Sequence, residues 1–95
     1  MIQSKRFVVT GRVQGVGYRY FVMQTVRGLA QRGIEITGWV RNMPDRSVEV
    51  CADGSGNDLQ ALSAEIAKGP SMGRVDQVRN EPAAPTGEST FLIKY

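Results

Sequence analysis

Hydrophobic and polar residues follow two periods along this chain, and each period predicts a different element. Residues 6–13 are dense in β-branched and aromatic side chains, which predicts a strand buried in the interior of a sheet. From Tyr18 onward the apolar residues recur at helical spacing, and Gly33 is expected to end this helix. The expected buried face of the helix consists of Val22, Val26, Leu29 and Ala30, opposite Gln24, Arg27 and Gln31.

The centre of the chain predicts a β-hairpin. Residues 36–42 and 47–52 are both rich in strand-forming residues, and the Pro-Asp turn at residues 43–46 is short enough to make them neighbours. Asn42 is therefore expected at the bend of the hairpin. Trp39, in the first strand of the pair, is expected to pack in the core.

A second helix and two further strands complete the pattern. Ser55 can begin the helix, since Asp58 three residues later can form a capping box with it, and residues 69–70 (Gly-Pro) end it. Residues 74–79 predict a short strand that is less apolar than the first and lies nearer an edge. Residues 91–95 predict a closing strand. The apolar positions here are Leu59, Leu62 and Ile66 on the helix and Phe91, Ile93 and Tyr95 on one face of the last strand.

The order of these elements predicts the fold class. The first six elements, strand, helix, strand, strand, helix and strand, have the βαββαβ order of an α+β, ferredoxin-like split βαβ sandwich, with two helices on one face of an antiparallel sheet. Ninety-five residues suffice for one domain over residues 1–95. This fold hosts enzymes, metal carriers and RNA-binding modules, so it does not define the function by itself.

The composition is that of an ordinary globular protein. Hydrophobic residues make up 41% and charged residues 22%, and no apolar run approaches the roughly 18 residues of a membrane span. The first residues lack the features of a secretory signal, and the single cysteine, Cys51, fits a reducing compartment, so we expect a cytoplasmic protein without membrane contact. The net charge of +3 comes mostly from arginines scattered between Arg6 and Arg79, which argues against nucleic acid as a partner.

Residues 11–19 (Gly-Arg-Val-Gln-Gly-Val-Gly-Tyr-Arg) lead from the first strand into the first helix and predict an anion cradle. Gly15 and Gly17 can turn successive N–H groups toward one point, and the helix N-terminus adds its dipole. Arg19 in the first turn can grip two phosphate or carboxylate oxygens. The loop lacks the Lys-Ser or Lys-Thr of a nucleotide P-loop and the third glycine of a dinucleotide motif. The alternative is a tight turn beside a solvated arginine.

Other chemistries find less support in the sequence. The chain has no histidine, and its acidic residues show no metal-ligand spacing, so neither a metal nor another cofactor is expected. Cys51 has no histidine partner and is expected to be a structural or surface thiol rather than a nucleophile. Tyr18 and Trp39 could stack on RNA bases, but aromatic residues make up only 7% of the chain.

The loop at residues 11–19, with residues 38–42 (Gly-Trp-Val-Arg-Asn) and 48–50 (Val-Glu-Val), resembles the acylphosphatase family. The likeness continues through residues 69–70 and closes at residues 91–95 (Phe-x-Ile-x-Tyr), so it spans nearly the whole chain. It implies an enzyme that hydrolyses the carboxyl-phosphate bond of small acyl phosphates to a carboxylate and inorganic phosphate, without metal or cofactor.

The resemblance also implies roles for individual residues. An arginine at the position of Arg19 binds the phosphoryl group together with the loop backbone, and an asparagine at that of Asn42 positions the attacking water. The implied phosphate-binding set is Gln14, Gly15, Val16, Gly17, Tyr18 and Arg19. Two departures stand out: the interval from Arg19 to Asn42 is several residues longer than is usual, which an extra helical turn would absorb, and Arg46 stands where glycine is common, which is expected to change the turn type.

The residues themselves suit this chemistry. The leaving group of an acyl phosphate is a carboxylate whose acid has a pKa of about 4, so it departs near neutral pH without a proton donor such as histidine. We expect inorganic phosphate, the product, to inhibit competitively, and the protein to be a monomer. The alternative is a non-catalytic ferredoxin-like module that binds RNA, or a carbamoyl-phosphate-related domain like that of hydrogenase maturation factors.

Overall fold

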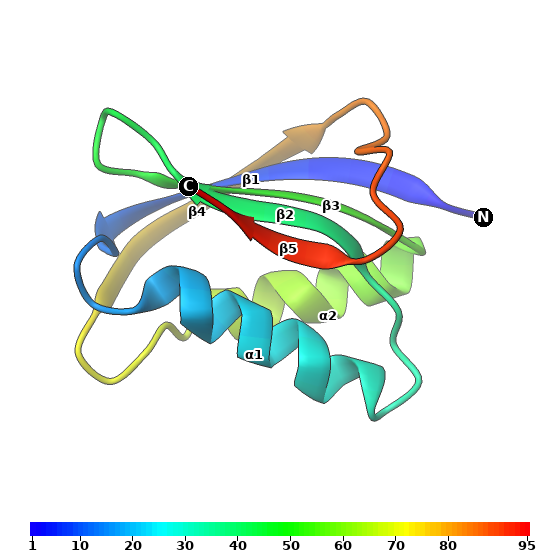
Figure 1. Cartoon of the computed structure of the whole chain (residues 1–95), viewed down its shortest axis with the longest axis horizontal. Coiled ribbons are helices and arrows are strands. Elements are labelled where there is room, and N and C mark those ends of the chain that lie inside the picture. Colours follow the sequence, from blue (N-terminus) through cyan, green and yellow to red (C-terminus); the bar gives the residue numbers. More distant parts are fainter.

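Five strands and two helices follow one another in the order that the sequence predicts (Figure 1). The structure is a computed structural model and describes residues 1–95. The strands are β1 (Gln3–Arg12), β2 (Thr37–Asn42), β3 (Val48–Gly54), β4 (Arg74–Pro82) and β5 (Phe91–Lys94), and the helices are α1 (Tyr18–Ala30) and α2 (Gly56–Ile66).

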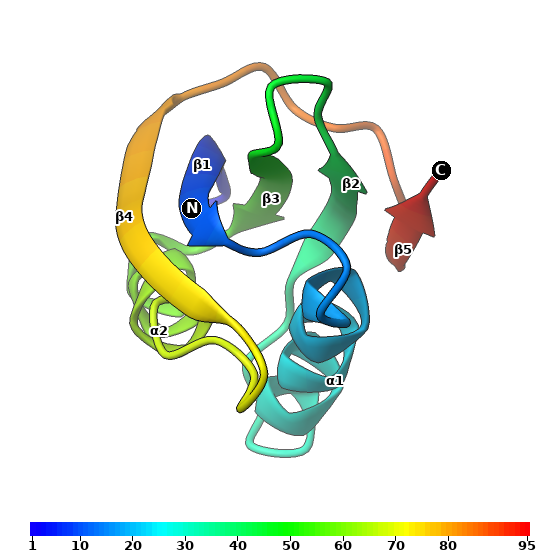
Figure 2. The same cartoon turned by 90° about the vertical axis from the view of Figure 1, so that its left-hand side faces the viewer.

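The strands form one sheet in the order β4-β1-β3-β2-β5 (Figure 2). The ferredoxin-like α+β class is confirmed, with β1 inside the sheet and the more polar β4 at an edge. The sheet is mixed rather than wholly antiparallel, because β5 pairs with β2 in parallel. The reason is the route of the chain: β4 ends where β2 begins, and residues 83–90 cross that end of the sheet to the opposite edge.

Both helices lie on one face of the sheet and leave the other face open (Figures 1 and 2). The α1 helix packs beneath β2 and β5, and α2 packs beneath β1 and β3. Sixteen buried residues form the core between the two layers, and they include most of the apolar positions predicted for the helices. Ala30 is an exception, because it lies exposed at the end of α1. Neither helix is long and apolar enough to cross a membrane.

The helix ends are specified by the residues that the sequence indicates. Gly33 has a φ of 81°, and its N–H and that of Ile34 donate to carbonyl oxygens of residues 29–30. This pairing is a Schellman motif, which satisfies the last carbonyls of α1 and releases the chain toward β2. Ser55 caps α2, since its hydroxyl accepts the N–H of Asp58 at 3.1 Å.

Trp39 lies on the open face of the sheet, so the prediction that it packs in the core was wrong. Its neighbour Val40 is fully buried between the layers, and successive residues of a strand point to opposite faces. Trp39 is therefore only partly buried, and the ammonium of Lys94 lies 3.8 Å from the centroid of its ring.

Three strands extend further than the apolar pattern predicted. The β1 strand begins at Gln3, β3 continues to Gly54, and β4 continues to Pro82. Few of the added residues carry apolar side chains, so no hydrophobic pattern marked them, yet their backbones still form ladder pairs such as Gln3 with Gly54. In the hairpin turn, Arg46 is the one non-glycine residue with a positive φ, 76°, a conformation that costs a side-chain-bearing residue about 1 kcal/mol.

Asp53 fastens the β4–β5 connection to one end of the sheet. Its carboxylate accepts the hydroxyl of Ser4 at 2.6 Å and the backbone N–H of Thr86 at 3.1 Å. The hydroxyls of Thr86 and Thr37 donate to it as well. Burial alone would raise the pKa of Asp53, but these donors outweigh burial and hold the pKa below its usual range.

We expect Asp53→Asn to lower the free energy of unfolding by about 2 kcal/mol at neutral pH, because hydrogen bonds to a charged acceptor are weakened. A carboxyl with a depressed folded-state pKa stabilises the fold above its unfolded pKa of about 3.9 and loses this effect as the pH falls through the folded value. The difference should therefore shrink in acid. Urea unfolding near pH 7 and near pH 3 measures it, with the exposed Glu35→Gln as control, and equal losses at both pH values would contradict the expectation.

Candidate active site

One cavity brings together segments that are far apart in the sequence. Its volume is about 210 Å³, and it lies where the β1–α1 loop meets the ends of β2 and β5. The sequence-predicted Arg19 and Asn42 therefore border the same space. The lining residues are Val13, Gly15, Gly17, Tyr18, Arg19, Tyr20, Asn42, Ile93 and Tyr95.

The β1–α1 loop has the backbone geometry of an anion cradle. Gly15 and Gly17 both adopt left-handed conformations, with φ angles of 75° and 78°. Gly17 caps α1 without a side-chain hydrogen bond, and none of the turn, loop or cap backbone hydrogen bonds uses an N–H of residues 15–20. The N–H groups at the positive end of the helix dipole are thus available to an anionic ligand.

Tyr18 fixes the start of α1 from within the core. Its side chain is only 1% exposed, and its hydroxyl donates to the carbonyl oxygen of Ile66 at 2.7 Å. Burial raises the pKa of the Tyr18 phenol, so it stays a neutral donor. The hydroxyl of Tyr18 is therefore committed to tying α1 to α2, and its backbone N–H is the group left for a ligand.

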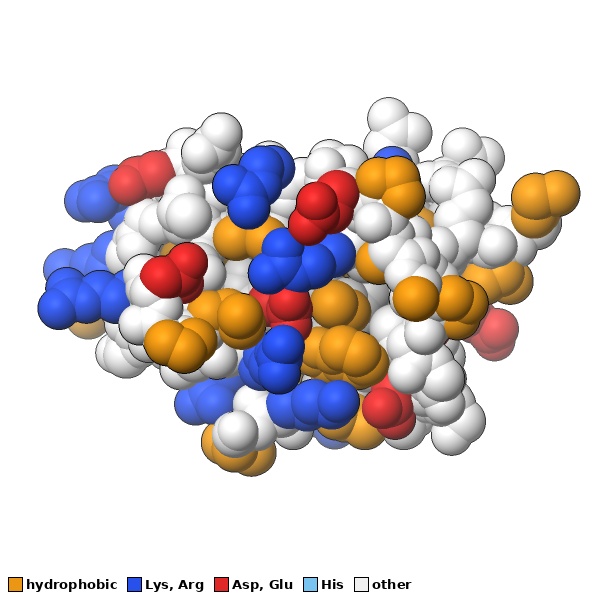
Figure 3. Space-filling view, turned by 90° about the horizontal axis from the view of Figure 1, so that it is seen from above, with side chains coloured by type: hydrophobic (Ala, Val, Ile, Leu, Met, Phe, Trp, Pro, Cys, Tyr) orange, Lys and Arg blue, Asp and Glu red, His pale blue; other side chains and the backbone are white.

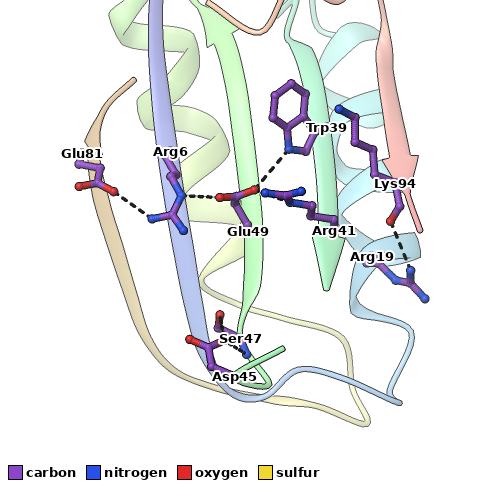
Figure 4. A network of polar contacts seen from close by, with 9 residues as sticks. All are labelled: Arg6, Arg19, Trp39, Arg41, Asp45, Ser47, Glu49, Glu81 and Lys94. Atoms are coloured by element: carbon purple, nitrogen blue, oxygen red, sulfur yellow. Dashed lines mark hydrogen bonds and ion pairs between the residues drawn. The ribbon is translucent and has the colours of Figure 1, made fainter. Parts of the chain in front are cut away.

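The guanidinium of Arg19 is held against the end of β5. One of its terminal nitrogens, Nη1, donates to the carbonyl oxygen of Lys94 at 3.5 Å (Figure 4). The Cζ of Arg19 lies 4.7 Å from the centroid of the Tyr95 ring. The hydrogen bond occupies one of five N–H donors, and the ring binds the flat face of the cation. The remaining donors are free to bind an anion in the cavity.

Asn42 ends β2 and carries an unpaired buried acceptor. Its side-chain Oδ1 is inaccessible to solvent and receives no hydrogen bond from the protein. Leaving such an acceptor without a partner costs about 1–3 kcal/mol, and buried polar atoms in native proteins nearly always have one. Asn42 also lines the cavity, so its side-chain amide is a candidate contact for a polar ligand.

Gln14 and Val16, also in the predicted phosphate-binding set, do not line the cavity. The side-chain amide of Gln14 donates to the carbonyl oxygens of Met43 and Ser47 at 2.9 and 2.8 Å, so it joins the loop to the β2–β3 hairpin. Val16 packs its side chain against the core. These residues hold the cradle beside Asn42.

Sequence reasoning assigned no site role to Lys94, Tyr95 or Ile93. Ile93 and Tyr95 line the cavity, and the backbone of Lys94 accepts from Arg19. The alternation of the last strand indicated that Ile93 and Tyr95 share a face, but no local signal indicated that this strand would lie beside α1. Their contribution became visible only with the parallel β2–β5 pairing.

Cys51 lies on β3 with its side chain on the open face, away from the cavity. It is 8% exposed, and burial raises the pKa of its thiol to about 11. At neutral pH almost none of it is the thiolate that a nucleophile requires.

We expect Cys51→Ser to leave turnover within about twofold of wild type, because the thiol neither borders the cavity nor ionises. Steady-state hydrolysis of benzoyl phosphate measures this, with a thermal melt to check that the fold is intact. Loss of turnover in a folded variant would make the thiol part of the reaction.

These features are those of a candidate anion-binding site on a protein of the ferredoxin-like α+β class. The family model for acylphosphatase matches residues 5–93. Among curated relatives, the acylphosphatase of Koribacter versatilis is 47% identical over 93 residues, which cover 97% of this chain and 80% of that protein. The chain belongs to the acylphosphatase family, and its activity is the hydrolysis of acyl phosphates.

Solved structures support the same assignment. The crystal structure of acylphosphatase from Bacillus subtilis matches with a TM-score of 0.83 and 33% identity, and the match covers 100% of both chains. Full-length HypF, in a phosphate- and nucleotide-bound form, matches with a TM-score of 0.82 at 23% identity, and the match covers 12% of that chain. That likeness concerns the fold alone, so the alternative of a maturation domain or a non-catalytic module is not favoured.

Proposed function

We propose that Arg19 and the N–H groups of the glycine loop bind the phosphoryl group of an acyl phosphate, and that Asn42 positions the water that attacks it. The loop set is Gln14, Gly15, Val16, Gly17 and Tyr18, with Gln14 and Val16 acting chiefly through the shape of the loop. The reaction is direct: the water oxygen bonds to phosphorus, the bond to the acyl oxygen breaks, and the carboxylate leaves with its electron pair. The proton of the water passes to the phosphate or to solvent.

The observation that carries this proposal is the unpaired Oδ1 of Asn42. In this conformation Oδ1 is closed to solvent, so a rotation of the side-chain amide would turn it toward a water in the cavity, and the same amide group can donate back through its nitrogen. Such a water would lie between Asn42 and a phosphoryl group held by Arg19, because both residues border one cavity. Holding the two reactants in one reactive geometry lowers the entropic part of the barrier.

Charge stabilisation accounts for the rest of the catalysis. The equatorial oxygens of the phosphoryl group carry negative charge in the transition state, and a guanidinium with fixed backbone N–H groups matches that charge without reorganisation. No three His, Cys, Asp or Glu side chains are grouped as metal ligands. In the proposed step, Arg19 and the backbone donors supply the charge stabilisation.

The test is phosphate release from benzoyl phosphate by purified protein. We expect the same rate in excess chelator as in its absence, much slower reaction with a phosphate monoester, whose alkoxide leaving group needs a proton donor, and competitive inhibition by inorganic phosphate. A requirement for magnesium, or comparable rates on both substrate classes, would overturn the mechanism.

Two further proposals concern the working form of the enzyme. We infer a monomer, which size-exclusion chromatography with light scattering would test. We also infer a cytoplasmic location, supported by the single buried cysteine, which suits a reducing compartment. The localisation of a tagged chain in its own cell tests that inference.

A further inference from the structure

The open face of the sheet holds a buried carboxylate that the reaction does not use. Charged side chains gather at the middle of this face (Figure 3). Glu49 on β3 is only 4% exposed. Its carboxylate accepts hydrogen bonds from the Nε of Arg41, at 2.7 Å, and from the Nε of Arg6. The indole N–H of Trp39 lies 3.5 Å from the same carboxylate (Figure 4). These donors outweigh burial, so the pKa of Glu49 lies below its usual range and the carboxylate is charged.

Two cationic residues are neighbours at the end of the β2–β5 ladder, and each side chain turns to its own partner. Arg41 on β2 and Lys94 on β5 are direct cross-strand partners, and both side chains lie on the open face. Like charges in this arrangement repel and destabilise the pair of strands. Glu49 compensates Arg41, and the Trp39 ring binds the ammonium of Lys94 at 3.8 Å.

Arg41 and Lys94 also lie next to the residues that line the cavity on the other face of the sheet. Strand residues alternate between faces, so Asn42 and Tyr95, which follow Arg41 and Lys94, turn toward the cavity. The backbone carbonyl of Lys94 and the ring of Tyr95 hold Arg19. The position of the last β2–β5 pair therefore bears on the separation of the Arg19 guanidinium and Asn42. The β5 strand is anchored to the core by Phe91 and Ile93, but it has four residues and pairs with β2 alone, so the pair after Ile93 also depends on its contacts on the open face.

We propose that Glu49, with Trp39, is a positioning residue of this enzyme: Glu49 neutralises Arg41 and Trp39 binds Lys94 on the open face, which keeps the ends of β2 and β5 together and so holds Arg19 and Asn42 at their working separation. The inference rests on the proposed roles of Arg19 and Asn42. Glu49 acts through these strands and touches neither substrate nor water.

The test is Glu49→Gln, which keeps the shape of the side chain and removes its charge. We expect kcat/KM for benzoyl phosphate to fall about tenfold and phosphate to bind several-fold more weakly, a coupling typical of residues within one charged network. Because the cause is repulsion, the ratio of variant to wild-type kcat/KM should recover in high salt, which screens exposed charges. Adding Lys94→Met to the variant should restore most of the loss, since one of the repelling charges is gone.

Glu81→Gln is the matched control. Glu81 also pairs with Arg6, at 2.9 Å, but lies on β4 at the far edge of the sheet, so its removal should leave catalysis and its salt dependence unchanged. If Glu49→Gln does not fold, Trp39→Leu tests the inference instead. We expect this variant to show a smaller fall in kcat/KM, which high salt should again reverse. A loss that neither salt nor Lys94→Met reverses, or a change of stability alone, would overturn the inference. Failure of wild-type protein to hydrolyse acyl phosphates would instead overturn the proposed function.

Discussion

Arg19→Lys is expected to lower kcat/KM for benzoyl phosphate by about 100-fold or more, nearly as much as Arg19→Ala. The ammonium of lysine is a point charge and cannot reproduce a planar grip on two phosphoryl oxygens. Lysine also lacks a planar group that could lie against the Tyr95 ring. In addition, its single nitrogen cannot replace the guanidinium, in which one nitrogen donates to Lys94 while another remains free for the phosphoryl group. A 100-fold loss corresponds to about 2.7 kcal/mol of transition-state stabilisation.

The same exchange elsewhere on α1 provides the control for Arg19. Arg27 is exposed in the last turn of the helix and has no side-chain partner, so Arg27→Lys should leave kcat/KM and phosphate inhibition unchanged. Steady-state kinetics and the inhibition constant of phosphate should be measured for both variants. If Arg19→Lys kept most of the wild-type activity, the two-pronged grip would be wrong and charge alone would suffice.

Asn42→Ala is expected to bind phosphate nearly as well as wild type while its turnover falls by about 100-fold or more, a barrier increase of about 2.7 kcal/mol. The variant loses the group that orients the water, whereas Arg19 and the loop N–H groups remain in place. Removing a buried acceptor that has no protein partner should also cost the fold little stability.

Three measurements distinguish this role of Asn42 from a structural one. Melting temperature, phosphate affinity and turnover should be determined for Asn42→Ala, with Asn80→Ala on the exposed β4 strand as the matched control. Unchanged turnover would remove Asn42 from the mechanism. A melting temperature that collapses together with turnover would assign Asn42 to the hairpin bend instead.

The parts of the site that sequence reasoning found are those made by local backbone chemistry. Gly15 and Gly17 indicated left-handed residues before a helix, and both adopt them. Ser55 with Asp58, and Gly33, indicated helix ends that the structure confirms. Each of these signals involves neighbours within a few residues, where side-chain type restricts the backbone directly.

The contacts of the site that the sequence did not predict join segments that are far apart in the chain. The side chain of Gln14 could have faced the ligand, and only the folded chain shows it bound to Met43 and Ser47 of the hairpin. The anchoring of Arg19 by Lys94 depends on a parallel strand pair whose direction no local pattern contains. The error on Trp39 was avoidable, because the fully apolar Val40 beside it could not share its face.

The β2–β5 pairing also bears on when the enzyme can first work. Seventy-five residues separate Arg19 from its partner Lys94, and β1 pairs with β4 over a comparable stretch of chain. Contacts between residues so far apart in the chain form only after the entropic cost of closing a long loop has been met. We therefore expect folding in milliseconds to seconds rather than microseconds. The ribosome adds about 5–20 residues per second, so β5 is synthesised several seconds after Arg19. We therefore expect a nascent chain without residues 91–95 to lack the contacts of Lys94 and Tyr95 with Arg19, and activity to begin once the last strand docks.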